Sequence, residues 1–134
     1  MDAVSYKFPK NSRLSSLTSV NEVFLKGRIL RVRGFKVFLL QNMSECNRIM
    51  IAVPKKIHRK AVTRNLIKRR IREAYRINTG ILNQGKGNCA DIILIYNSDE
   101  IPEFAGLKNT VCNVLKKIRG LIDADTLPAV PVAD

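Results

Sequence analysis

The stretch Asp91-Ile92-Ile93-Leu94-Ile95-Tyr96-Asn97 places four aliphatic residues in a row between polar ends. A strand with one face in water alternates apolar and polar residues, whereas this run is apolar on both faces. It is also far too short to cross a bilayer as a helix. The run therefore predicts a strand in the middle of a sheet or under a helix.

The elements around this strand follow from apolar spacing and from turn residues. We expect a short helix at 16–27 closed by Gly27, strands within 28–41 (best defined at 35–40) and at 49–53, a helix at 64–78 that Thr63 caps and Gly80 ends, and a helix from 104 to about 120. The order α-β-β-β-α-β-α predicts an α/β fold, a single-domain two-layer sandwich of a small sheet and about three helices. The domain spans 1–122, and 123–134 form a disordered tail.

Charge is concentrated in one part of the 134-residue chain. The net charge is +13, and the segment from Cys46 to Ala90 holds 12 Lys or Arg residues against one acid, Glu73. Such an imbalance indicates a polyanionic partner, of which nucleic acid is the best candidate. A membrane surface is disfavoured because the basic residues have no accompanying apolar face. With no apolar stretch of signal-peptide length, we expect a soluble, cytoplasmic protein.

Three cysteines, Cys46, Cys89 and Cys112, are too few and too widely spaced for a disulfide framework or a zinc site. The expectation is that all three are reduced and that the protein binds no metal through them.

The predicted helix at 64–78 carries like charges at i, i+4 spacing. These are Arg64, Lys68, Arg72 and Arg76. Each such pair destabilises an isolated helix by roughly 0.2–0.5 kcal/mol, and Glu73 can offset part of this through Arg69 or Arg76. A solvated face would tolerate acids among these cations. Their near absence favours a face that neutralises phosphates, which arginine can grip bidentately.

The segment 60–75 resembles the signature of the bacterial ribonuclease P protein family. The positions that match are Ala61, Val62, Arg64, Asn65, Lys68, Arg69, Arg72 and Glu73. The chain departs from the signature at Leu66, where the family usually has arginine. Similar stretches are Phe8-Pro9-Lys10, Val23-Phe24-Leu25-Lys26-Gly27 and Ile51-Ala52-Val53-Pro54-Lys55-Lys56.

This resemblance implies a fold with a left-handed βαβ crossover, similar to a ribosomal-protein domain. It also implies a ribonucleoprotein enzyme that removes 5′ leaders from precursor tRNA. The catalytic RNA performs the chemistry with Mg²⁺, and the protein supplies no catalytic side chain and no metal site. The partners are that RNA and precursor tRNA, with a protein that is monomeric when free and binds the RNA one to one.

Two surfaces are implied for this chain. Contacts to the catalytic RNA fall to Lys55, Lys56, Lys60, Arg64, Asn65, Lys68, Arg69 and Arg72. Contacts to the single-stranded leader fall to Phe24, Phe35 and Phe38, to Val20 where many members carry an aromatic, and to Lys10 and Arg13 of the N-terminal arm. Rings can stack on unpaired bases, although core packing is an equally good interpretation of Phe35.

Other classes of function remain. A ribosomal or general RNA-binding protein of similar fold would bind RNA without any role in leader removal. A DNA-reading helix would need a preceding helix and tight turn, whereas strands and a basic loop are expected here. A protein nuclease would need more acids; its one candidate base, His58, is better interpreted as contacting or flanking RNA.

Overall fold

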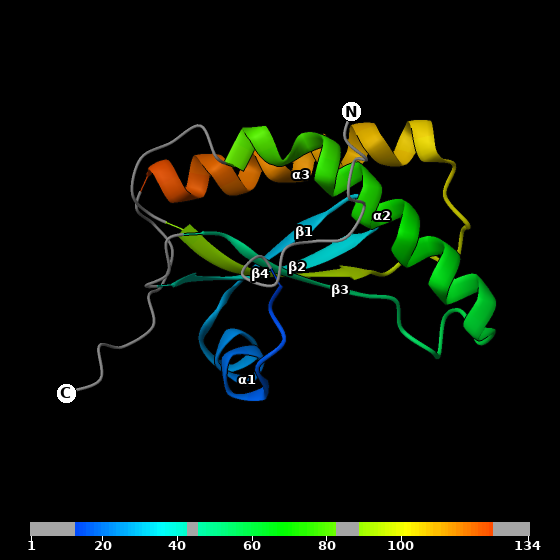
Figure 1. The fold of residues 1–134 in the computed structure, drawn as a ribbon, viewed down its shortest axis with the longest axis horizontal. Coiled ribbons are helices and arrows are strands. Elements are labelled where there is room, and N and C mark those ends of the chain that lie inside the picture. The colour runs from blue at the N-terminus through cyan, green and yellow to red at the C-terminus, as the bar shows by residue number, and fades with distance from the viewer. Residues whose placement is uncertain (1–12, 43–45, 83–88, 125–134) are drawn as a thin grey trace, which may run out of the picture.

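The computed structural model describes residues 13–42, 46–82 and 89–124, which form one mixed sheet with helices on both faces (Figure 1). The elements are α1 (Leu17–Lys26), β1 (Arg28–Val32), β2 (Phe35–Asn42), β3 (Arg48–Ala52), α2 (Ala61–Leu82), β4 (Cys89–Tyr96) and α3 (Phe104–Asp123). Helices α2 and α3 cover one face of the sheet, and α1 lies alone on the other. The predicted α/β class and element order are confirmed.

Strand β4 lies inside the sheet, whose strand order is β1-β2-β4-β3. It pairs antiparallel with β2 and parallel with β3. Ile92 and Leu94 face α2 and α3, Ile93 faces α1, and none of the three has any exposed surface. The prediction from the apolar run is thus confirmed on both faces.

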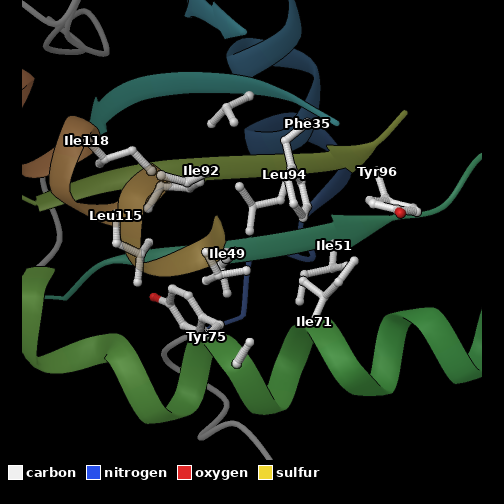
Figure 2. Packing of buried hydrophobic residues seen from close by; sticks show 14 of the residues in the cluster. Phe35, Ile49, Ile51, Ile71, Tyr75, Ile92, Leu94, Tyr96, Leu115 and Ile118 are labelled. Atoms are coloured by element: carbon white, nitrogen blue, oxygen red, sulfur yellow. The ribbon is translucent and has the colours of Figure 1, made fainter. Parts of the chain in front are cut away.

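The main core lies between the sheet and the helices α2 and α3. Figure 2 shows Ile71 and Tyr75 of α2 meeting Ile49 and Ile51 of β3, with Leu115 of α3 alongside. A smaller cluster under α1 joins Leu14 and Val23 to the opposite side of β2 and β4. Because α1 has only ten residues, it covers less of its face than the two long helices cover of theirs.

Both long helices continue past the glycines predicted to end them. Helix α2 also begins at Ala61, three residues before its predicted start, and runs through Gly80 to Leu82. Leu82 is buried, and its carbonyl oxygen accepts a 2.8 Å hydrogen bond from Nη1 of Arg119. Core contacts and this bond outweigh the weak helix propensity of glycine. Helix α3 likewise passes Gly120 and reaches Asp123.

Strand β3, helix α2 and strand β4 form the expected parallel crossover. The left hand of that crossover stays a prediction. The arm and the tail predicted at the two ends of the chain fall mostly on residues 1–12 and 125–134, which lie outside the described residues.

Gly27 ends α1 for a reason other than backbone freedom. Its φ of −72° and ψ of 155° are open to any residue. A Cβ at this position would lie 2.4 Å from the carbonyl oxygen of Val23 and 2.9 Å from that of Leu39. The absence of a side chain therefore lets α1 turn directly onto strand β2.

We expect Gly27→Ala to lower the free energy of unfolding by about 1–3 kcal/mol, because two backbone oxygens must move away. Gly120→Ala is the matched control, since a Cβ there meets nothing within 4 Å and alanine favours the helix. Urea denaturation followed by circular dichroism measures both. Equal stabilities of the two variants would contradict the close approach.

Candidate nucleic-acid interface

The basic loop and the first turns of α2 form one cationic surface. We call it the basic surface; it comprises Lys55, Lys56, Lys60, Arg64, Asn65, Lys68, Arg69 and Arg72. All eight are exposed or half-buried, and they lie between the end of β3 and the middle of α2. The structure therefore brings together every residue predicted to contact the catalytic RNA.

Buried contacts fix the loop that begins this surface. His58 is only 7% exposed, its Nε2 lies 2.8 Å from the carbonyl oxygen of Ser98, and its ring stacks on Tyr96. Nη1 of Arg64 donates to the carbonyl oxygens of His58 and Arg59, at 3.0 and 2.7 Å. His58 thus anchors the loop, and its interpretation as an RNA contact is wrong because the ring is enclosed. Arg64 shapes the loop as well as charging it.

Few acids neutralise α2. Glu73 accepts from Nε of Arg76 at 2.9 Å and also contacts Nη2, which settles which of its two expected partners it takes. Within 13–42, 46–82 and 89–124, Lys68, Arg69 and Arg72 form no ion pair with a carboxylate. Their charges face water without compensation, at the cost of mutual repulsion.

A second surface lies on the α1 side of the sheet, which we call the open face. Phe24 of α1 is 42% exposed and meets Phe38 of β2 edge to face, with ring centroids 4.9 Å apart. Val20 packs against the same cluster, and Nζ of Lys36 lies 5.3 Å from the Phe38 ring centroid. An exposed ring next to a cation can hold a stacked base and a neighbouring phosphate.

Three of the six residues predicted to bind the leader therefore come together, namely Val20, Phe24 and Phe38. The prediction for Phe35 is wrong, because its ring is 3% exposed and packs on Tyr96 in the main core, on the other face. Arg13 is exposed beside Ile49, at the outer edge of β3. Lys10 lies outside the described residues.

One polar cluster escaped the sequence analysis. Asp91, 1% exposed, accepts from Nε and Nη2 of Arg48 at 2.7 and 2.6 Å, and from the Asn42 side chain at 2.7 Å. These hydrogen bonds raise the pKa of the Arg48 guanidinium above its ordinary value. The only signal in the sequence was an opposite charge at the start of each of two strands that pair in parallel.

The described residues include no cluster of three or more His, Cys, Asp or Glu side chains that could hold a metal ion. No helix among them is long and apolar enough to cross a membrane. Cys46, Cys89 and Cys112 are unbridged, and burial raises the pKa of the Cys89 thiol.

Fold and charge together define a small α/β protein with an uncompensated cationic helix beside an aromatic sheet face. The ribonuclease P family model matches residues 8–119. The ribonuclease P protein component of Porphyromonas gingivalis (strain ATCC 33277) is 30% identical over 129 residues, which are 92% of this chain and 94% of the relative. The chain belongs to the ribonuclease P protein family.

Solved structures agree with this assignment. The RNase P protein of Staphylococcus aureus superposes with a TM-score of 0.68 at 27% identity, covering 81% of this chain and 95% of that one. The RNase P protein of Thermotoga maritima gives a TM-score of 0.67 at 29% identity, covering 78% and 96%.

The cluster at Asp91 yields a prediction about stability. Asp91→Asn keeps the shape but removes the charge that holds Arg48, so we expect a loss of about 2 kcal/mol in unfolding free energy. Asp123→Asn is the control: it removes a carboxylate that pairs with Arg119 at an exposed site, for which less than about 1 kcal/mol is expected. Chemical denaturation compares them, and a larger loss from the control would contradict the role given to Asp91.

Proposed function

We propose that this protein is the protein subunit of ribonuclease P, which assists a catalytic RNA in removing 5′ leaders from precursor tRNA. The observation that carries the proposal is the pairing of two different surfaces. One is a helix face with uncompensated cations, and the other is a sheet face with an exposed ring. Family membership supplies the enzyme to which these surfaces belong.

The basic surface binds the catalytic RNA through its phosphates. Each phosphate that Lys68, Arg69 or Arg72 neutralises releases condensed counterion, so affinity falls as salt rises. Arg64 keeps the loop from Lys55 to Lys60 in place through the carbonyl oxygens of His58 and Arg59. The loop and the helix therefore meet RNA as one preformed surface, which lowers the ordering cost of binding.

The open face takes the single-stranded leader. Unpaired bases stack on aromatic rings with roughly 1–3 kcal/mol per base, and the exposed edge of Phe24 beside Phe38 offers such a platform. Lys36 lies where a phosphate of the same strand would pass. Val20 leaves the platform smaller than an aromatic would.

The reaction itself is assigned to the RNA, with Mg²⁺ bound there. Lysine and arginine side chains are protonated at neutral pH and can serve neither as metal ligands nor as bases. Glu73, the one acid of the basic segment, is engaged by Arg76. The protein works as a monomer in a one-to-one complex with the RNA, in the cytoplasm.

The test combines the purified protein, a bacterial ribonuclease P RNA and a 5′-labelled precursor tRNA at low Mg²⁺. The protein should accelerate the release of mature 5′ ends. Arg69→Ala/Arg72→Ala should weaken RNA-subunit binding about tenfold and reduce the slope of log affinity against log salt by about 1.5. Lys116→Ala/Lys117→Ala, which removes the same charge from exposed positions on α3, is the control and should change neither.

If the protein binds RNA tightly but leaves leader cleavage unchanged, the proposal fails and a ribosomal-type RNA-binding role replaces it. If the two double variants weaken binding equally, net charge rather than the basic surface governs the interaction.

A separate variant tests the leader platform. Phe24→Leu keeps the packing on Phe38 but removes the ring face, so affinity for precursor tRNA should fall roughly three- to tenfold. Affinity for mature tRNA, which has no leader, should not change. Leu25→Ala, at the exposed neighbouring position, serves as the control. Fluorescence titration of the assembled enzyme measures all three, and an equal loss for mature tRNA would argue against stacking.

A further inference from the structure

The strand register arranges the open face in rows that cross the sheet. One row consists of Arg31, Lys36, Ile95 and Ala52, from β1 to β3. The adjacent row consists of Ile29, Phe38, Ile93 and Met50. A cationic row therefore runs beside an apolar row that contains the aromatic platform.

The cationic row is accessible. Arg31 is exposed, and Lys36 and Ile95 are half-buried. Their strand neighbours Val37 and Leu94, which point to the other face, have no exposed surface. Helix α1 thus leaves this row uncovered, unlike the Leu40 and Ile93 positions under Val23.

Charge along the first hairpin is one-sided. The sequence has five Lys or Arg between Glu22 and Glu45 and no acid. Glu22 faces Lys26 at 3.6 Å, and in the described part of the chain no carboxylate forms an ion pair with Arg31 or Lys36. The hairpin is therefore a second uncompensated cationic feature, separate from the basic surface.

The row connects the two cationic features. At its β3 end, Ala52 is followed after two residues by Lys55 and Lys56 of the basic surface. At its β1 end lies Arg31. Four neighbouring strands span about 14 Å, which is the length of about four stacked nucleotides at roughly 3.4 Å each. An RNA strand that starts at the basic loop can thus cross the sheet along this row.

We propose that Arg31 and Lys36 bind leader phosphates and lead the RNA out over the β1 edge. This rests on the proposed function and adds a path and two positioning residues to it. The bases then lie over the row of Phe38 and Ile29, and the backbone follows the cations. Only leaders longer than about four nucleotides reach Arg31, so the chain distinguishes precursors by leader length as well as by the presence of a leader.

A matched control exists on the same strand. Arg28 is exposed like Arg31, but it pairs with Leu39, whose side chain belongs to the main core, so Arg28 lies on the other face. Arg28→Ala and Arg31→Ala therefore remove the same charge from the same strand, on opposite sides of the sheet.

The experiment measures the dissociation constant of the assembled enzyme for two precursor tRNAs, with leaders of two and of eight nucleotides. Arg31→Ala should weaken binding of the eight-nucleotide precursor roughly three- to tenfold and reduce its salt slope by about 0.7. Binding of the two-nucleotide precursor should be unchanged. Lys36→Ala should behave likewise, and Arg28→Ala should affect neither precursor.

An equal loss with both leaders, or equal losses from Arg28→Ala and Arg31→Ala, overturns this path, and so does an unchanged constant for the longer leader. Failure of the proposed function looks different, because the wild-type protein would then not accelerate cleavage of either precursor.

Discussion

The fold depends on one constraint, which is that β4 is apolar on both faces and must be covered on both. Two long helices cover one face completely. The ten-residue α1 covers only part of the other, and this incomplete cover creates the open face with Phe24 at its border. The same residues that require a buried strand thus determine where an accessible groove-like surface can remain.

The second organising interaction is the buried contact of Asp91 with Arg48 and Asn42. It ties β3 to β4 at the end where both strands begin, and β2 joins through Asn42. The opposite end of β3 leads into the basic loop, which His58 and Arg64 fasten. The basic surface and the open face are therefore held on a common strand, so one RNA-protein complex can engage both at a fixed spacing.

Much of this could be predicted from the sequence, and the failures have physical reasons. The run Ile92–Ile95 and the charges of α2 depend on local pattern and were predicted correctly. Glycine propensity failed at Gly80 and Gly120 because tertiary contacts of residues such as Leu82 decide where a helix ends. Phe35 was misplaced because a strand that is buried on both faces does not reveal which face each residue takes. The pairs Arg48–Asp91 and Arg31–Lys36 depend on strand register, which no single segment contains.

The two borders of the sheet differ in a way that concerns the protein before it meets any RNA. The outer side of β3 is protected, since Leu14 donates its N–H to the Ile49 carbonyl oxygen. In the described chain, nothing pairs with the outer side of β1. Unpaired strands invite edge-to-edge aggregation, which positive charges resist. Arg28 and Arg31 therefore give the free protein a built-in safeguard against sheet-to-sheet aggregation, using side chains whose charge also attracts polyanions.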